Sequence, residues 1–399
     1  MFKMRLKKYT AIAVLCSFTA LMSSCGKADD AYKNATEYLN EGKYDEAIKS
    51  FKSAIKENSD RAEYYIGYGM ALNYTGQYNA ALDEFDKAVQ DVENKISKQN
   101  NKQLYYGKAI AYYGLNDYNN AVEVCDDAIK INQAKDLNYD INLLKAASLQ
   151  LLGDINGAEK TYSDIINDSS NAEAYLRRGD LYSQSGDYDN ACKDYENAIK
   201  KDSKCYDAYF GIYKAYHSQN NEQKADEALE RVISLDGNNK EELMQKGRAY
   251  IYKKDYDKAS SKLDLAVKNG NISAIYYQGM IKMEMNDYDG AIELFEKYLK
   301  ESSVVNIPEV YNQLAGCYIE KGDFDNAQTI ITKGIKSANT SIAGLLRKNQ
   351  VILYEKTGDF KSAKKEAEKY IKAYPADDGM AKELKFIKTR ITAQKKAGK

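Results

Sequence analysis

The sequence predicts an all-α solenoid built from about ten helical hairpins. The first observation is an alanine that recurs ten times just after a turn signal, at spacings of 32 to 40 residues. The second is that apolar and small residues beside each turn repeat every three or four positions, which places them on one helix face. A period near 34 residues is typical of helical-hairpin arrays. The recurring residues are Ala47, Ala81, Ala121, Ala158, Ala191, Ala225, Ala259, Ala291, Ala327 and Ala363.

The segment from Tyr175 to Lys200 shows the repeating unit clearly. Apolar or small residues lie at Tyr175, Gly179 and Tyr182, and a second set follows Gly186. A glycine at that point can adopt the left-handed conformation that ends a helix. Two helices of about a dozen residues are marginal alone in water. The unit is therefore expected to be a hairpin that needs neighbours to pack against.

Other positions recur in step with the alanine. A Gly or Ala usually precedes it by twelve residues, and a large residue such as Phe51, Phe85, Tyr162, Tyr195 or Phe295 often follows it by four. The turn position is Gly or Asn in nine copies and Lys254 in the other. The turn residues are Gly42, Gly76, Asn116, Gly153, Gly186, Asn220, Lys254, Asn286, Gly322 and Gly358.

On these positions the chain resembles the tetratricopeptide-repeat (TPR) family over roughly residues 28–377. The resemblance implies a right-handed superhelix, with the array over residues 31–375 and a C-terminal capping helix with a basic tail over 376–399. The repeats are expected to begin near Ala28, Ala62, Lys102, Tyr139, Ala172, Tyr206, Lys240, Ile272, Pro308 and Gly344.

Two copies depart from the repeat pattern. Repeat six has Tyr213 at the small-residue position and Glu222 at an aromatic one, and repeat ten has Val351 and Ala367 where a small and a large residue are expected. Local packing should therefore differ in these repeats. After repeat two, the second helix is expected to run on through residues 91–99 as a protruding helix end or loop.

The N-terminus has the layout of a secretory signal. Four basic residues precede a mostly apolar run from Tyr9 to Met22, which is too short to span a bilayer as a mature helix. Ser23 and Ser24 then precede Cys25, an ending that resembles a bacterial lipobox. The resemblance implies a lipoprotein signal peptide over residues 1–24, a lipidated Cys25, and a short tether over 25–30. The protein would then be lipid-anchored on the extracytoplasmic side of a bacterial envelope membrane; the alternative is an ordinary cleaved signal and secretion.

Composition and motifs argue against several function classes. Without the first 24 residues the chain has 54 basic and 59 acidic residues, a net charge of −5, which argues against nucleic acid as a partner. The sequence shows no CxxC motif, Cys/His cluster, nucleophile elbow, HExxH motif or phosphate-binding loop. We therefore expect no enzyme activity, no metal site and no cofactor.

The fifth position of each predicted first helix is the candidate binding column, because it faces the concave groove in proteins of the family that the chain resembles. Eight successive members are apolar, and a large exposed apolar surface usually marks a binding site. The alternative is that tight winding buries the column as core. Its members are Tyr32, Ile66, Tyr106, Leu143, Leu176, Phe210, Met244 and Tyr276, followed by Asn312 and Lys348.

Acidic residues are frequent at the second position of the same helices. They would line the groove edge for a basic peptide, or they would complement the helix dipole, which is worth about 0.3–1 kcal/mol each. The acidic members are Asp29, Glu63, Asp140, Glu173, Asp207, Glu241 and Glu309.

These features favour a membrane-tethered scaffold that holds a segment of a partner protein in its groove, in envelope assembly or secretion. The alternative function is a ligand-capture lipoprotein that holds a glycan or peptide for uptake by tyrosine stacking. Exposed tyrosines clustered in one pocket would favour capture of a glycan, whereas an apolar trough would favour protein binding.

Overall fold

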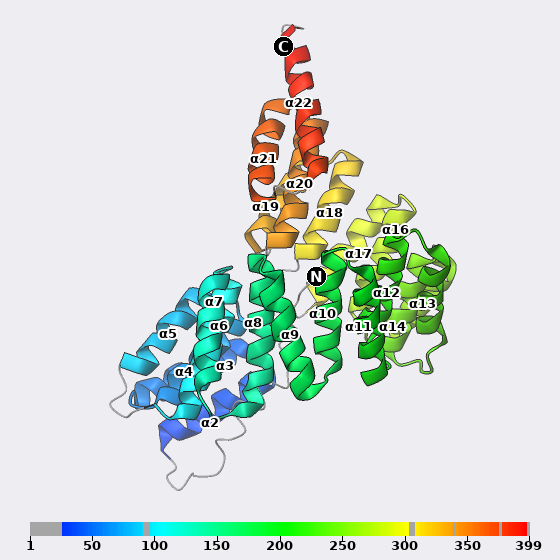
Figure 1. Ribbon diagram of the computed structural model, residues 1–399. Helices are drawn as coiled ribbons and strands as arrows, with labels where there is room; N and C mark the ends of the chain where they lie inside the picture. The colour runs from blue at the N-terminus through cyan, green and yellow to red at the C-terminus, as the bar shows by residue number, and fades with distance from the viewer. Residues whose placement is uncertain (1–25, 91–95, 303–307, 338–339, 375–376, 397–399) are drawn as a thin grey trace. The chain divides into compact units, whose positions relative to one another are not determined.

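The computed structural model describes residues 26–90, 96–302, 308–337, 340–374 and 377–396. The signal peptide, Cys25 and Pro375 lie outside these residues. Every regular element in the described part is helical, as the sequence predicts (Figure 1). No helix there combines the length and the apolar character needed to cross a bilayer.

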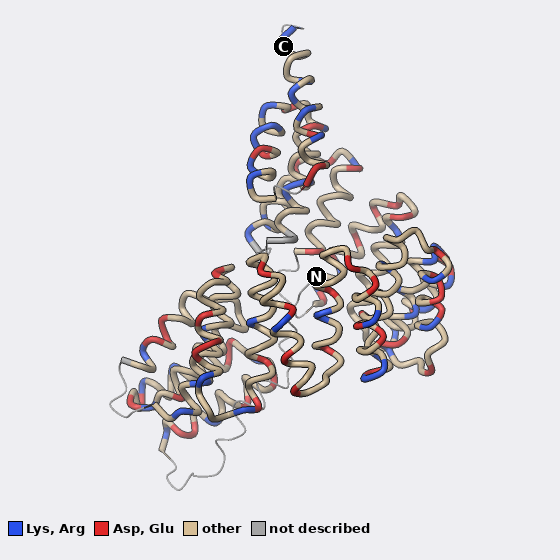
Figure 2. The backbone as a smooth tube through the Cα atoms, in the orientation of Figure 1, with Lys and Arg blue, Asp and Glu red and all other residues tan. Residues whose placement is uncertain are grey.

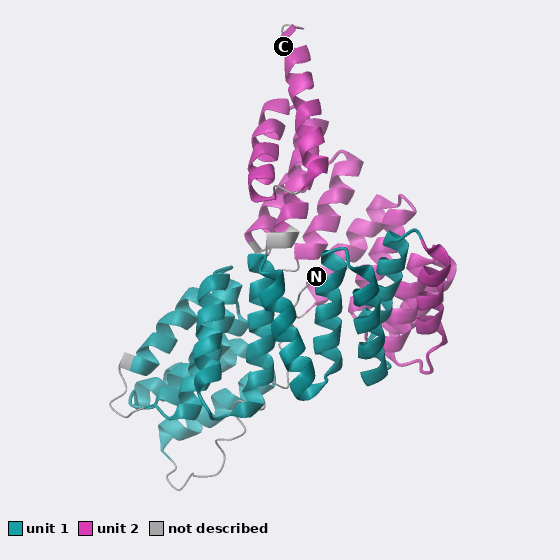
Figure 3. Ribbon diagram, viewed as in Figure 1, with its two compact units in different colours: residues 1–220 teal, residues 221–399 magenta. Residues whose placement is uncertain are grey.

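The chain divides into two compact units, residues 1–220 and 221–399 (Figure 3). The boundary falls in repeat six, between its two helices, where Tyr213 and Glu222 depart from the repeat pattern. Unit 1 contains α2 (Lys27–Asn40), α3 (Tyr44–Glu57), α4 (Ala62–Tyr74), α5 (Tyr78–Gln90), α6 (Lys98–Gly114), α7 (Tyr118–Lys130), the 3₁₀ turn η2 (Lys135–Leu137), α8 (Asn138–Leu152), α9 (Ile155–Ser169), α10 (Ala172–Gln184), α11 (Tyr188–Lys201) and α12 (Tyr206–Ser218). Unit 2 contains α13 (Glu222–Ser234), α14 (Lys240–Tyr252), α15 (Tyr256–Lys268), α16 (Ser273–Glu284), α17 (Tyr288–Glu301), α18 (Pro308–Lys321), α19 (Phe324–Ser337), α20 (Thr340–Lys356), α21 (Phe360–Ala373) and α22 (Asp378–Lys396).

The hairpin turns have the backbone that the sequence predicts. All ten turn residues have positive φ, between +57° and +82°. Lys254, with φ of +58°, adopts this conformation without being Gly or Asn. In most repeats the second helix begins two residues after the turn residue. The residue between these two is the N-cap of that helix, and its side chain accepts a hydrogen bond from a backbone N–H group. These caps are Asp117, Asp154, Asp187, Asn221, Asp255, Asp287, Asp323 and Asp359.

Large rings wedged between small residues hold successive hairpins together. Phe85 lies between Gly69 of its own repeat and Gly107 of the next, since a Cβ added at either glycine would come within 2.6 Å or 2.3 Å of the ring. Tyr195 lies in the same way between Gly179 and Gly211, where the corresponding distances are 2.8 Å and 2.5 Å. Only a residue without a side chain fits at these points, so the small-residue positions set how closely the helices approach.

The long spacing between repeats two and three differs from the prediction. The second helix of repeat two, α5, ends at Gln90, and residues 98–99 begin α6 instead of extending α5. Ser97 causes the early start, because its side chain accepts a hydrogen bond from the N–H of Asn100 and so caps α6. Residues 91–95 of the predicted extension lie outside the described residues.

The other long connector, between α7 and α8, is held by a buried lysine. The Nζ of Lys102 donates to the carbonyl oxygens of Ile131 and Gln133 at 3.1 Å and 2.9 Å, and to Oδ1 of Asn138 at 2.5 Å. These contacts join the C-cap residue of α7, the connector and the first residue of α8 to α6. Burial of the ammonium group lowers the pKa of Lys102.

The predicted C-terminal helix is α22, and it packs against α21. Met380 and Ile387 form its buried face, while Gln394 donates to the carbonyl oxygen of Gly358 at 3.0 Å. The carboxyl groups of Glu355, on α20, and Glu383, on α22, face each other. Burial and the Glu383 carboxylate raise the pKa of Glu355 from 4.5 to about 7.

We predict that α22 docks more firmly in mild acid than in mild base. A carboxyl whose folded pKa is raised contributes stability below its unfolded pKa, and this is lost as the pH rises through about 7. Amide exchange of α22, corrected for intrinsic rates, should therefore show more protection at the lower pH. Glu355→Gln should remove this difference, whereas Glu368→Gln, at an exposed site on α21, should leave it. The same pH dependence in the Glu355 variant would contradict the assignment.

Candidate functional site

The structure places the predicted binding column mostly inside the helical core. Seven of its eight members are at most 9% exposed: Tyr32, Ile66, Tyr106, Leu143, Leu176, Phe210 and Met244. Tyr276 is half-buried. This burial matches the alternative in which the column is core, and a role of these side chains in partner binding stays a prediction.

Contacts with neighbouring helices explain the burial. The ring of Tyr32 lies 5.9 Å from that of Phe51 and 5.0 Å from that of Tyr64, in the next repeat. The ring of Tyr276 packs against Phe295 at 5.6 Å. Burial raises the pKa of Tyr106 well above its usual value, as expected for a phenol removed from water. These tyrosines therefore serve the packing of the array.

The acidic second positions lie where the dipole interpretation requires. All seven are in the first turn of their helices. Several also have partners within the chain: Asp29 accepts from the hydroxyl of Tyr64 at 2.8 Å, and Glu173 accepts from Arg177 at 2.8 Å. These contacts favour a structural role.

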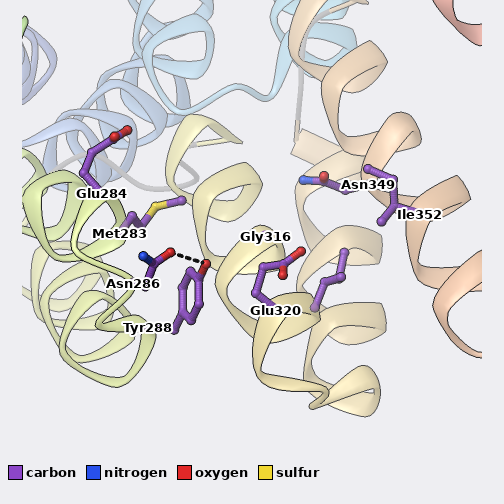
Figure 4. Close-up of a pocket in the computed structure, with 9 residues that line it drawn as sticks. Met283, Glu284, Asn286, Tyr288, Gly316, Glu320, Asn349 and Ile352 are labelled. Carbon is purple, nitrogen blue, oxygen red and sulfur yellow. Dashed lines mark hydrogen bonds between the residues drawn. The ribbon is translucent and has the colours of Figure 1, made fainter.

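A cavity of about 280 Å³ opens in unit 2 on the face formed by three successive first helices. Figure 4 shows residues from the end of α16, the turn after it and the start of α17, together with residues from α18 and α20, around this space. The lining residues are Met283, Glu284, Asn286, Tyr288, Gly316, Ile319, Glu320, Asn349 and Ile352. The volume lies just below the ~300–1,000 Å³ typical of pockets that enclose a small molecule. It suits a few side chains of a longer ligand.

Gly316 lines this cavity and, because it has no side chain, leaves open space above the backbone of α18. It lies inside α18, yet a Cβ added there would meet no atom within 4 Å. By contrast, a Cβ at Gly247 would lie 2.7 Å from Leu263, and one at Gly279 would lie 2.7 Å from Phe295. A glycine inside a helix costs about 0.5–1 kcal/mol relative to alanine. At Gly316 no packing contact accounts for this loss of helix stability. The open space above the helix backbone is therefore a candidate for a functional feature.

The rim of the cavity is apolar and acidic. Ile352 is 40% exposed and Met283 is half-buried, while Glu284 and Glu320 are exposed. None of the nine lining residues is basic. The Nδ2 group of Asn349 donates to Oδ1 and to the carbonyl oxygen of Asn312, both at 3.1 Å, and the hydroxyl of Tyr288 donates to Asn286 at 3.0 Å. The site therefore combines fixed polar groups with an apolar surface and negative charge.

A second depression, of about 810 Å³, lies over the α14–α15 turn and α16. Two of its lining residues are paired with each other, since Gln278 donates to Asp264 at 2.6 Å, and Asp255 accepts from Lys258, outside the lining, at 2.7 Å. Its charges are of both signs. We therefore regard the smaller cavity as the candidate site.

The cysteines have the environment of structural thiols. Cys125, Cys192 and Cys317 are buried, Cys205 is half-buried, and none of these four described cysteines forms a disulfide. Burial raises the pKa values of Cys205 and Cys317 to about 12, which disfavours the reactive thiolate. In the parts of the chain that the structure describes, no group of three or more His, Cys, Asp or Glu could hold a metal ion.

Sequence reasoning missed Gly316, Ile319 and Ile352. These residues lie four or seven positions beyond the fifth position of their helices, on the same helix face. The available signal was Gly316 itself, a glycine that follows the small residue Ala315 and is not required by the repeat pattern. Its open surroundings were visible only once the neighbouring helices were in place.

The fold defines an array of helical hairpins packed one against the next. Family models of the tetratricopeptide repeat match residues 32–100, 102–135, 172–205, 206–239, 273–302 and 308–341, more than half of the sequence. The chain belongs to the tetratricopeptide-repeat family. The matches that begin at residues 102, 172, 206 and 308 coincide with predicted repeat starts.

Two curated relatives extend over most of the chain. A TPR repeat-containing protein of Methanocaldococcus jannaschii is 25% identical over 349 residues, which cover 77% of this chain and 56% of that protein. The mitochondrial import receptor subunit TOM70 of Homo sapiens is 24% identical over 328 residues, which cover 77% of this chain and 50% of the receptor. The chain spans about half the length of these relatives.

Solved structures of other repeat proteins are also similar. PilW, described as a type IV pilus biogenesis factor, is 16% identical with a TM-score of 0.45, over 52% of this chain and 93% of PilW. A tetratricopeptide repeat protein from Parabacteroides merdae is 15% identical with a TM-score of 0.40, over 72% of this chain and 98% of that protein.

We predict opposite effects of alanine at two glycines inside helices. Gly107→Ala places a Cβ against Phe85 and should destabilise α6 by roughly 1–3 kcal/mol through overpacking. Gly316→Ala meets open space and should stabilise α18 by about 0.5–1 kcal/mol. Amide exchange of each host helix measures the two effects separately. Loss of protection in α18 of the Gly316 variant would show that its surroundings are not open.

Proposed function

We propose that the protein is a membrane-tethered, extracytoplasmic scaffold that binds a segment of a partner protein in the groove of unit 2. A role in envelope assembly or secretion fits this proposal. The observation that carries it is the open space over Gly316, which has an apolar rim and lies on the face of three successive first helices. A helix backbone without a side chain lets a ligand main chain or a large side chain approach closely.

The lining residues suggest the chemistry of the partner segment. An apolar side chain would sit over Gly316 between Met283 and Ile352. A Lys or Arg beside it would meet Glu284 and Glu320, the two carboxylates of the rim. Glu320 already has a cation at 3.9 Å, Lys356, so a ligand cation would share or replace a weak ion pair there. The preferred segment is therefore apolar with flanking basic residues.

Glycan capture, the alternative function, has less support. It would use exposed tyrosines as stacking surfaces, but each of the two cavities is lined by a single tyrosine, Tyr288 or Tyr256. Many other tyrosines are core residues, among them Tyr64, Tyr106, Tyr162 and Tyr195, at most 2% exposed. The relative TOM70, named as an import receptor subunit, adds support for a protein ligand.

The location rests on the sequence of the first 25 residues. A basic start, a short apolar run and Ser23-Ser24 before Cys25 fit a lipoprotein signal. A diacylglyceryl group on Cys25 would supply the two acyl chains that stable anchoring requires.

Groove binding can be tested with a displayed library of random peptides. We expect enriched sequences that combine apolar and basic residues, and a synthetic peptide of the enriched sequence serves as the probe. Gly316→Leu, which fills the cavity, should weaken its binding by at least about tenfold, that is by about 1.4 kcal/mol.

Ser260→Leu is the matched control, because it adds the same side chain in the second depression and should leave peptide affinity unchanged. Circular dichroism checks that both variants keep their helices. Equal affinity of the two variants, or a peptide that binds only the Ser260 depression, would move the site away from the groove.

The membrane tether makes a separate prediction. Cys25→Ser should shift the protein from the membrane fraction to the soluble fraction and abolish labelling by radioactive fatty acid, because the acyl attachment atom is lost. Cys16→Ser, within the signal, should change neither. Labelling that persists in the Cys25 variant would refute lipidation at this residue.

A further inference from the structure

Positive charge is concentrated at the C-terminal end of the chain. Residues 340–396 contain 14 Lys and Arg against 7 Asp and Glu, a net charge of +7, whereas residues 26–339 contain 39 against 52, a net charge of −13. Figure 2 shows the basic residues along α21 and α22. Among the described side chains of α20–α22, eleven Lys and Arg are exposed against three acidic residues. The excess is therefore a surface property.

The fold fixes which face of α22 carries this charge. Met380 and Ile387 are buried against the preceding hairpin, so the opposite face points outward. That outer face contains Lys382, Lys385 and Lys396, all exposed. The helix is thus held on its apolar side and presents a basic side.

An aromatic ring stands among these lysines. Phe386 is 47% exposed, and the guanidinium of Arg390 lies over it at 5.1 Å from the ring centre. It shares the outer face with Lys382, one turn earlier. A basic helix face with an exposed aromatic ring is typical of helices that lie on a membrane surface.

Four exposed lysines continue the charge along α21. Lys361, Lys365, Lys369 and Lys372 follow one another at spacings of four, four and three residues, which places them on one helix face. Like charges at such spacings repel each other within the helix. A polyanionic surface outside the protein would relieve this repulsion.

We propose that the outer face of α22, together with the lysine stripe of α21, binds an anionic phospholipid surface. Clusters of four to eight Lys and Arg residues are attracted to anionic bilayers within about a Debye length. Screening at physiological salt acts over about 8 Å, so charges farther than this from the basic face contribute little to its attraction.

A bilayer fits this surface better than nucleic acid does. Of the eleven exposed cations only Arg390 is an arginine, whereas recognition of individual phosphates favours the bidentate guanidinium group. Lysines act as point charges and suit a diffuse layer of headgroups. The exposed ring of Phe386 also has a natural place at the bilayer interface.

The proposal concerns a surface outside the groove and does not depend on lipidation of Cys25. It is tested with the unlipidated chain from Gly26 to Lys399, which contains every described helix. The probe is vesicles of phosphatidylcholine with about one-third phosphatidylglycerol, and sedimentation measures the bound fraction. We expect binding at about 100 mM salt, much weaker binding at about 500 mM, and none to pure phosphatidylcholine.

The test variant combines Lys382→Gln, Lys385→Gln and Lys396→Gln. Each lysine near the surface contributes about fivefold, so binding should fall on the order of a hundredfold. The matched control, Lys193→Gln with Lys200→Gln and Lys201→Gln, removes three exposed charges from α11 and should bind as the parent does. Phe386→Ala should weaken binding equally at both salt concentrations.

Three results would overturn the proposal. They are equal binding to neutral and anionic vesicles, an equal loss in the two triple variants, and binding of a DNA duplex or self-association through α22 without vesicle binding. Because the chain in this test carries no lipid and needs no peptide, failure here would leave the groove and the tether to be judged by their own experiments.

Discussion

Close packing of large side chains against small residues sets how successive hairpins approach, and it is clearest at two junctions where one ring lies between two glycines. Phe85 lies between Gly69 and Gly107, and Tyr195 lies between Gly179 and Gly211, so one ring joins its own hairpin to the next. A single added methyl group at any of these glycines would come within 3 Å of the ring. Close-packed interiors tolerate such an insertion poorly, because neither ring nor helix backbone has space to move. At these two junctions the spacing of successive hairpins follows from this contact.

Tight spacing has a consequence for binding. When first helices approach closely, the side chains at their fifth positions become part of the core, as the burial of Tyr106 and Phe210 shows. An inner surface can then offer room only where a side chain is missing or displaced. Gly316 provides that room in unit 2. Like the glycines that pack against rings it has no side chain, but no ring lies within 4 Å of the position where its Cβ would be. Glycines such as Gly69 and Gly107 therefore allow helices to pack closely, whereas Gly316 leaves a cavity.

Unit 2 carries surfaces of opposite charge. The groove rim at Glu284 and Glu320 is acidic, whereas the exposed faces of α21 and α22 are basic. Surfaces of opposite sign on one unit favour different partners, because each attracts what the other repels. A scaffold that holds a basic segment in its groove and rests its C-terminal end on an anionic surface would use both. The lipid proposed at Cys25 would act at the other end of the sequence.

The sequence by itself determined the helices, the hairpins and the repeat boundaries, because these depend on local signals. These signals act over a few positions: turn residues with positive φ, aspartate caps, and apolar residues that repeat every three to four positions. The helices α10 and α11 could therefore be placed from the amino-acid sequence alone. Where a local signal was overlooked, as with the cap at Ser97, the predicted boundary was wrong. Only the tertiary structure decided which of these positions are core and which are open, since exposure depends on residues about 20 or more positions away. The column from Tyr32 to Met244 and the cavity at Gly316 occupy the same face of their helices, and distant neighbours alone distinguish them.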